Sequence, residues 1–356
     1  MTLIASLAAD GHPTLFGDLL LTGPTANTAP NVSIPALGNV SNFFGNSGWV
    51  VSRLAQKICL VSDRLVVAWS GSWLGASLVL AELRRRDALG LLSYSDIFEY
   101  LNGEEELALH PASFIGLISE KDGIRRFHFH AEELDSQSHG KLFYAGTGAC
   151  IFKDLTESVI SSDACAVGPD NPILTALSAN LFFGAALLQT EYLQGDAATT
   201  IRNMFGGGYE IAHYDYRLRR FEKIAPITYI LWTVDCTDGS VHVGLPRLIV
   251  AQHYSGEFLL IRSLRFDPST VSQAPLNVDE RRFVIAPMIA SEQMPTVARI
   301  ADIHIESSTY CHCIAVHVAG KSIGIGTIIS QNVSPADQSF RLEFHDGKVK
   351  FSTREV

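Results

Sequence analysis

The chain begins MTLIASLAADGHPTLFGD (residues 1–18), and the fold prediction starts from this stretch. Residues 2–8 and 13–21 are apolar or alternate in polarity on either side of Asp10-Gly11, a dipeptide typical of hairpin turns. Two antiparallel strands are therefore expected, with Thr2 at the start of the first and Asp18 within the second. Removal of Met1 makes Thr2 the N-terminal residue.

An N-terminal threonine combines a nucleophile with its own base. Its α-amine has an ordinary pKa of about 7.7–8.0, so a fraction is neutral at cellular pH and accepts the hydroxyl proton. Because Met-Thr begins many ordinary proteins, the prediction depends on further residues at fixed distances from Thr2. Asp18 lies sixteen residues after Thr2, and Thr22 four residues after Asp18. Further on, residues 57–72 read KICLVSDRLVVAWSGS and lead into an apolar helical run.

With these residues and spacings, the chain resembles the proteasome β-subunits, a family of N-terminal-nucleophile hydrolases. The resemblance covers about residues 2–225 and is clearest as far as Arg86. It implies an α+β fold, a four-layer αββα sandwich of two sheets between pairs of helices. It also implies a threonine peptidase or amidohydrolase that assembles as a homo-oligomer.

The resemblance assigns roles to individual residues. It makes Thr2 the nucleophile, and Asp18 and Lys57 the charged pair beside it. A lysine close to the nucleophile favours the alkoxide, and a carboxylate keeps that lysine in place and charged. Gly71 is the expected backbone N–H donor to the oxyanion, a role commonly worth a few kcal/mol of barrier. Thr22 is the expected contact for the substrate backbone.

The second half of the expected site departs from the family pattern. Thr147, in the stretch FYAGTGA (residues 143–149), stands where the family has a serine that helps to orient the threonine. In the stretch NMFGGG (residues 203–208), Asn203 replaces a carboxylate and Gly206 replaces a serine. The last two changes remove hydrogen bonds that position the amine, which leaves an active or an inactive site open.

Composition narrows the class of protein and its partners. The 356 residues are 47% hydrophobic, enough for a full core, and their net charge of −10 argues against a nucleic-acid partner. No apolar stretch reaches the roughly 18 residues of a membrane span, and the N-terminus lacks a signal peptide. We therefore expect a cytoplasmic protein without a membrane partner, whose six cysteines are buried or free thiols.

Two segments stand apart from the resemblance. Residues 22–49 are rich in Gly, Pro, Asn, Ser and Thr and form an inserted loop longer than the family's connection. This loop is either a passive, flexible connection or a lid or inter-subunit contact, and Phe43, Phe44 and Trp49 favour packing. Residues 226–356 read as short strands separated by turns, which predicts a β-rich sandwich or barrel domain of unknown role after a first domain over 1–225.

Hydrophobic periodicity predicts the regular elements between these landmarks. Helices are expected over 73–83, 93–100, 150–161, 172–192 and 196–204, and hairpins over 112–130 and 209–223. In the C-terminal part, strands are expected over 227–234, 242–250, 258–266, 282–285, 301–306, 310–317, 323–329, 340–345 and 350–352.

One group of soft ligands in the C-terminal part could hold zinc. Cys311, Cys313 and His317 fall on one face of a predicted strand, where side chains alternate with a period of two. Cys-x-Cys on a single strand is not a usual zinc spacing, and thiols commonly serve as small core residues. Neither a metal nor another cofactor is predicted.

Two functions remain open from the sequence. In the first, removal of Met1 exposes Thr2, which cleaves peptide or other amide bonds through an acyl-enzyme. In the second, the chain keeps the proteasome-like fold as a non-catalytic scaffold or ring-forming protein.

Overall fold

A computed structural model of the chain describes residues 2–24, 31–41, 43–136, 140–161, 172–237, 240–243, 246–266, 278–290, 309–318, 321–331, 338–345 and 348–355. In these residues the protein is a mixed α/β structure with several sheets and few helices.

The first sheet has six strands and grows from the N-terminal hairpin. The predicted turn is confirmed: strands β1 (Ile4–Leu7) and β2 (Thr14–Asp18) are antiparallel and joined by the short 3-10 helix η1 (Ala9–Gly11). Gly11 has a φ of 77°, a conformation that glycine adopts without steric cost. The sheet order is β11-β12-β1-β2-β13-β14. The four other strands are β11 (Glu132–Ser136), β12 (Gly140–Ala145), β13 (Tyr209–Asp215) and β14 (Arg220–Lys223).

A second sheet of four strands packs face to face on the first. Its order is β10-β9-β8-β7, so β7 is an edge strand. Its strands are β7 (Ile58–Ser62), β8 (Leu65–Gly71), β9 (Ala112–Glu120) and β10 (Gly123–Phe129). Ile4 and Leu15 of the first sheet pack against Ile58, Val66 and Ile115 of the second. Apolar residues on the facing sides of both sheets thus form a core between them.

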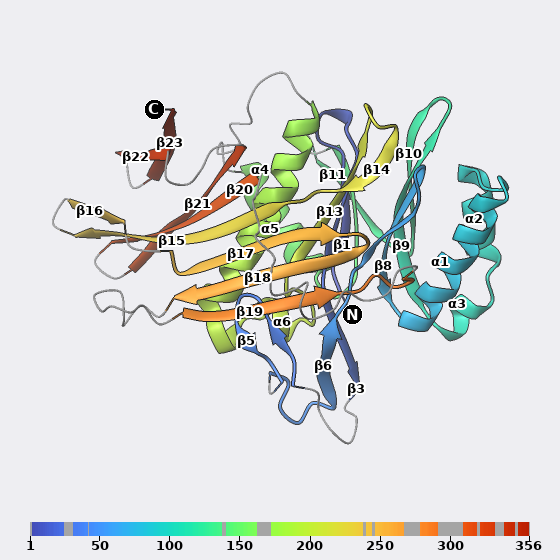
Figure 1. The fold of residues 1–356 in the computed structure, drawn as a ribbon, viewed down its shortest axis with the longest axis horizontal. Coiled ribbons are helices and arrows are strands. Elements are labelled where there is room, and N and C mark those ends of the chain that lie inside the picture. The colour runs from blue at the N-terminus through green and yellow to red at the C-terminus, as the bar shows by residue number, and fades with distance from the viewer. Residues whose placement is uncertain are drawn as a thin grey trace.

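Helices cover the outer face of the four-stranded sheet. They are α1 (Trp73–Ala88), α2 (Tyr94–Gly103) and α3 (Glu106–Leu109). Ser72 caps α1 by accepting a hydrogen bond from Gly75 N, and Ser93 and Asp96 form a capping box at α2. Figure 1 shows these helices beyond β8 and β10, on the side away from the six-stranded sheet.

The long helix α5 (Pro172–Gln194) is apolar around most of its circumference, which indicates burial on more than one side. Its core includes Phe16 and Tyr209 of the six-stranded sheet and Tyr229 and Cys311 of the C-terminal strands. In Figure 1, α5 lies behind β15, β17 and β18 and in front of β1 and β13. The other helices of this region are α4 (Ala149–Ser161), η2 (Gly195–Ala197) and α6 (Thr199–Arg202). None of the described helices combines the length and apolar character needed to cross a bilayer.

From Ile227 onward, every regular element of the described chain is a strand, in agreement with the sequence prediction. Seven strands form a sheet of order β19-β18-β17-β15-β20-β21, with β16 paired to β15. They are β15 (Ile227–Thr237), β16 (Ser240–Val243), β17 (Leu248–Ser255), β18 (Phe258–Phe266), β19 (Val278–Ile285), β20 (Thr309–Val318) and β21 (Lys321–Gln331). The last two strands, β22 (Gln338–His345) and β23 (Lys348–Glu355), pair with each other.

One predicted strand of this region differs from the structure, and another cannot be compared with it. The single strand expected over 242–250 is divided between β16 and β17, and Pro246, which has no backbone N–H for a sheet ladder, lies between them. The strand expected over 301–306 lies outside the described residues. Because the seven-stranded sheet packs on α5, residues on either side of the predicted boundary at 225 share one hydrophobic core.

The inserted segment is packed into the protein where it is described. Strand β3 (Leu20–Pro24) pairs with β6 (Trp49–Leu54), and β4 (Ser33–Ile34) pairs with β5 (Gly38–Asn39). Ile34 and Val40 are buried against Leu20 and Ile201. Ser263 Oγ donates a 2.6 Å hydrogen bond to Pro35 O, which fastens the segment to the C-terminal sheet. These contacts hold the described residues of the segment against the rest of the protein.

The close approach of the C-terminal sheet to α5 predicts an effect on stability. A Cβ atom on Gly184 would lie 2.9 Å from Tyr229 Oη and 3.7 Å from Phe16 Cε2. We expect Gly184→Leu to lower the free energy of unfolding by about 1–3 kcal/mol through overpacking. Gly103→Leu on α2 is the control, because a Cβ there meets no atom within 4 Å. Urea denaturation measures both, and equal stabilities of the two variants would contradict the packing described here.

Candidate functional site

Thr2 and Asp18 lie together at the start of β1 and the end of β2. Both are fully buried, and Thr2 Oγ1 donates a short hydrogen bond to Asp18 Oδ1. Asp18 also accepts hydrogen bonds from the backbone N–H groups of Leu3 at 3.0 Å, Leu20 at 3.3 Å and Gly206 at 2.7 Å. Thr2 O accepts a 3.2 Å hydrogen bond from Gly148 N. The carboxyl group of Asp18 therefore accepts hydrogen bonds from four donors, one of which is the threonine hydroxyl.

Burial and hydrogen bonding act in opposite directions on Asp18. Loss of water contact raises the pKa of its carboxyl group, and this effect is the largest. The charge of Lys57 and the donors from Thr2, Leu3 and Gly206 lower the pKa, but by less. The pKa of Asp18 is thus raised by burial although its neighbours favour the charged form.

Lys57 is a fully buried cation beside this group. Gly17 makes room for it: a Cβ on Gly17 would lie 3.3 Å from Lys57 Cβ. Within the described part of the chain, Lys57 Nζ has no hydrogen-bond partner, and it lies 4.4 Å from the centre of the Trp69 ring. Burial lowers the pKa of Lys57 to about 8, although the charges of Asp18 and Glu210 act to raise it. The link between Lys57 and Asp18 is therefore electrostatic.

Three glycines pass between two buried carboxyl groups. Gly206 N donates to Asp18, and Gly207 N donates a 3.3 Å hydrogen bond to Glu191 Oε1. Gly206, Gly207 and Gly208 have φ values of 115°, 74° and 119°, which favour glycine. A Cβ on Gly206 would lie 2.3 Å from Glu191 Oε1. The glycine at 206 is thus explained by the space that Glu191 occupies.

Glu191 is a residue of this region that the sequence motifs did not identify. It is fully buried, and Tyr209 Oη donates a 2.8 Å hydrogen bond to its Oε1. Burial raises the pKa of Glu191 to about 8. A signal was present, because Glu191 is the sole charged residue in the sequence of α5. An acidic residue inside an otherwise apolar helix indicates a buried polar contact.

The other expected substrate contacts are Gly71 and Thr22. Gly71 ends β8 with a φ of 93°, and a Cβ there would lie 2.7 Å from Pro111 O, so glycine is required. No hydrogen bond joins Gly71 to Thr2 among the residues that the structure describes. Thr22 is buried in β3 opposite Val51 of β6, and its Oγ1 finds no partner in the described residues. Strand β6 therefore occupies the edge of β3 beside Thr22.

Thr147 and Asn203 lie at the surface. Thr147 is exposed, and its neighbour Gly148 makes the backbone contact to Thr2. Asn203 is exposed after α6, where its Nδ2 donates a 2.7 Å hydrogen bond to Thr199 O. The structure thus brings together Thr2, Asp18 and Lys57, and it joins neither Thr147 nor Asn203 to them through any contact among the described residues.

A second buried charge cluster contacts the backbone of Lys57. Glu210, on β13, is fully buried and pairs with Lys223 Nζ at 2.6 Å. Tyr254 Oη donates a 2.8 Å hydrogen bond to Glu210 Oε1, and Lys57 N donates one of the same length to Oε2. Lys223 Nζ also donates to Gln56 Oε1 at 2.6 Å. None of Glu210, Lys223 and Tyr254 was identified from the sequence, where they carry no motif.

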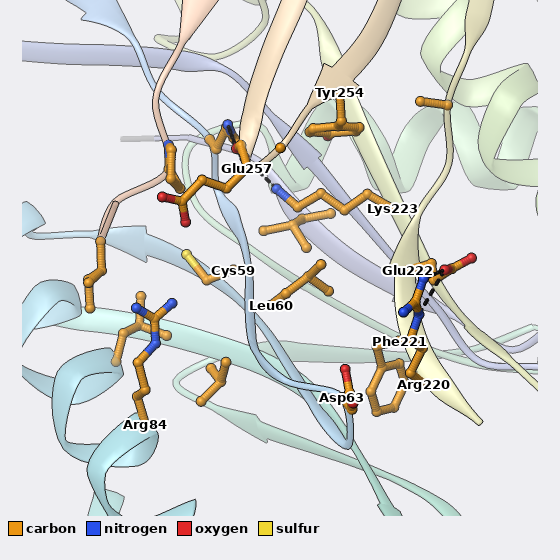
Figure 2. Close-up of a pocket in the computed structure, with 18 of the residues that line it drawn as sticks. Cys59, Leu60, Asp63, Arg84, Arg220, Phe221, Glu222, Lys223, Tyr254 and Glu257 are labelled. Carbon is orange, nitrogen blue, oxygen red and sulfur yellow. Dashed lines mark hydrogen bonds and ion pairs between the residues drawn. The ribbon is translucent and has the colours of Figure 1, made fainter. Parts of the chain in front are cut away.

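A cavity of about 760 Å³ opens beside this second cluster. Figure 2 shows Lys223 and Tyr254 on one side of it, Arg84 on another, and Cys59 and Leu60 of β7 between them. Gln56 and Ile58, the neighbours of Lys57, line the cavity, whereas Thr2, Asp18 and Lys57 do not. The cavity is therefore lined by the residues on either side of Lys57 and does not reach Thr2.

The cysteines of β20 belong to the core. Cys311 and Cys313 are buried against α5, and Cys313 Sγ lies 3.7 Å from Ala185 O. His312 Nδ1 accepts a 3.2 Å hydrogen bond from Trp232 Nε1. His317 has no described side chain. In the described residues, no three His, Cys, Asp or Glu side chains are grouped to hold a metal ion.

Comparisons with known proteins give matches to solved structures only. No protein-family model matches the chain. No curated protein matches it. The structure is similar to that of eukaryotic HslV from Trypanosoma brucei, with 14% sequence identity and a TM-score of 0.34. The match covers 59% of this chain and 97% of the HslV chain. Identity and TM-score are both low, so the match carries no assignment of function.

The buried carboxyl group of Glu191 predicts how stability changes with pH. Its pKa is about 8 in the folded protein and near the ordinary 4.5 in the unfolded chain. Between these values the folded state keeps a proton that the unfolded chain releases. The contribution of Glu191 to stability is therefore complete below about pH 4.5 and is lost as the pH rises through about 8.

Glu191→Gln keeps an acceptor for Tyr209 and removes this titration. From pH 5 to pH 8, the variant should gain on the order of 3 kcal/mol of unfolding free energy relative to the unmodified protein. Urea denaturation at both pH values measures the difference. Glu99→Gln, at an exposed position of α2, is the control and should show no gain. Parallel stability curves for Glu191→Gln and the unmodified protein would contradict the assigned pKa.

Proposed function

We propose that this chain is a threonine-type N-terminal-nucleophile hydrolase that cleaves peptide or other amide bonds after removal of Met1. The observation that supports this most is Lys57: a fully buried lysine without a hydrogen-bond partner in the described residues, beside a buried Thr2–Asp18 pair. An unpaired buried charge costs several kcal/mol of solvation and does not serve stability. Perturbed titratable groups that cluster in this way are typical of functional sites.

The arrangement of layers agrees with this proposal. Two packed sheets carry α1–α3 on one outer face and α5 on the other. We interpret these layers as the four-layer αββα sandwich of the proteasome-like hydrolases, and the seven-stranded sheet as an addition to it. Thr2 then begins the strand at which that fold places its nucleophile.

The proposed reaction uses the groups at Thr2. The free α-amine accepts the hydroxyl proton while Oγ1 attacks the amide carbonyl carbon, and the resulting oxyanion is bound by the N–H of Gly71. The C–N bond breaks, the departing amine takes the proton, and an ester to Thr2 remains. Water then hydrolyses this ester and restores the hydroxyl. Lys57 lowers the energy of the developing alkoxide, and Asp18 orients both groups.

The remaining expected residues have supporting roles in this proposal. Thr22 would bind the substrate backbone, whereas Thr147 and Asn203 are exposed and would have to move to orient the free amine. Thr2 is fully buried in the structure, so the site is closed as described. Reaction requires that the chain before Thr2 be removed and that a path to its hydroxyl open.

A second candidate is a non-catalytic protein that keeps this fold and forms a homo-oligomer. Two observations favour it: the complete burial of Thr2, and the exposed positions of Thr147 and Asn203. Leu74 and Leu78, one turn apart on α1, are 48% and 43% exposed and offer an apolar stripe for contact with another copy.

Labelling of Thr2 distinguishes the two candidates. The protein, purified from its native host, is treated with an epoxyketone, which needs both a free threonine amine and a hydroxyl to form its ring adduct. We expect loss of the Met1 mass and one adduct by intact mass spectrometry. The labelling rate should fall once the pH exceeds about 8, because Lys57 then loses the charge that stabilises the developing alkoxide.

Variants identify the residue that is labelled. Thr2→Ala should abolish the adduct, whereas Thr199→Ala, at an exposed threonine, should leave the labelling rate unchanged. A retained Met1 together with no adduct would reject the hydrolase and leave the non-catalytic candidate.

A further inference from the structure

The backbone N–H of Lys57 is held by a carboxylate instead of by a neighbouring strand. Strand β7 is at the edge of its sheet, so its outward N–H groups have no strand to bind. Glu210 Oε2 accepts hydrogen bonds from Lys57 N at 2.8 Å and from Ile58 N at 3.3 Å. The position of Lys57 therefore depends on where Glu210 lies.

Glu210 is in turn held by residues that surround its other oxygen. Glu210 Oε1 accepts from Lys223 Nζ at 2.6 Å and from Tyr254 Oη at 2.8 Å. Lys223 belongs to β14 and Tyr254 to β17, so the C-terminal sheet supplies one of the two contacts. With four donors, the buried carboxylate has both oxygens satisfied.

The residue before Lys57 is also tied to the C-terminal sheet. Gln56 Nε2 donates hydrogen bonds to Glu257 O at 2.9 Å and to Ile285 O at 2.7 Å. Gln56 Oε1 accepts from the same Lys223 Nζ that pairs with Glu210. The chain on both sides of the Lys57 side chain is thus fixed by one connected network.

We propose that Glu210 is a positioning residue for Lys57, and that the C-terminal sheet holds Glu210 in this role through Tyr254 and the Gln56–Lys223 contact. The catalytic meaning of this positioning rests on the function proposed above. It gives the seven-stranded sheet a role in the site, although none of its residues contacts Thr2 among the contacts of the described residues.

The charge of Glu210 has a second consequence for Lys57. The groups that act on the pKa of Lys57 are Asp18, Glu210 and Cys59, which raise it, and burial and Arg53, which lower it. Loss of the Glu210 charge should therefore lower the pKa of Lys57, whereas a purely mechanical contact would leave it unchanged.

Amide hydrogen exchange measured by NMR tests the positioning directly. In Glu210→Gln, the amides of Lys57 and Ile58 should exchange at least about tenfold faster, because a neutral acceptor binds them less strongly than a carboxylate. The amide of Trp69, which donates to Lys57 O from inside the sheet, should keep its rate. Glu222→Gln is the matched control on β14, since Glu222 pairs with Arg220 at the surface and should change neither.

The titration of the Lys57 side chain is measured on the same samples. Its 13Cε resonance should show a midpoint that is about one pH unit lower in Glu210→Gln and unchanged in Glu222→Gln. Equal exchange at Lys57 and Ile58 in all proteins, or an unchanged Lys57 midpoint, would overturn the proposal. Uniform acceleration across β7 to β10 would also overturn it, because it indicates general loosening of the sheet.

A milder variant covers the case in which Glu210→Gln does not fold. Tyr254→Phe removes one hydroxyl donor to Glu210 and leaves its charge pair with Lys223 intact. Exchange of the Lys57 and Ile58 amides should still accelerate, by less than in Glu210→Gln. Unchanged exchange in a folded Tyr254→Phe protein would remove the C-terminal sheet from the proposal.

Epoxyketone labelling separates this inference from the proposed function. If Thr2 is labelled in the unmodified protein, Glu210→Gln should lower the rate between about tenfold and a hundredfold, as expected for a misplaced catalytic group. If the unmodified protein is not labelled while the NMR results hold, the hydrolase proposal is wrong and the control of Lys57 by Glu210 stands.

Discussion

The carboxyl group of Asp18 is the point at which distant parts of the chain meet. It binds the hydroxyl of Thr2 and the backbone N–H groups of Leu3, Leu20 and Gly206. The first strand, the start of β3 and the glycine segment before β13 are thereby fixed to one buried acceptor. Removal of this carboxyl group would leave several buried donors unpaired, each at a cost of about 1–3 kcal/mol.

Two opposing effects act on the charge of the buried Lys57 side chain. Loss of solvation disfavours the charge, and attraction to nearby carboxylates favours it. The largest effect on the charge of Lys57 is burial, which disfavours it, while the charges of Asp18 and Glu210 favour it. Glu210 is neutralised by Lys223, but Lys57 has no such direct pair among the described contacts. A lysine with a pKa of about 8 changes its charge near neutral pH, a property that ordinary surface lysines lack.

The C-terminal sheet has two kinds of contact with the rest of the protein. Its apolar face covers α5, and its β17 and β19 ends supply polar contacts to the residues around Lys57. A further hydrogen bond, from Ser263 to Pro35 O, joins the sheet to the segment between β3 and β6. These contacts join the sheet to the residues around the candidate site.

The sequence by itself determined most of the regular elements, because strand and helix patterns are local. The hairpin at Asp10-Gly11, the strand-rich part after residue 226 and the helix expected over 172–192 all follow from periodicity and turn residues. Spacing and resemblance also identified Thr2, Asp18 and Lys57, which the fold brings together. Only the tertiary structure decided that Glu191 and Glu210 complete their surroundings, that Asn203 faces away, and that the inserted segment is packed. These features depend on side chains that meet from distant parts of the sequence or from different sheets, and no local pattern encodes such contacts.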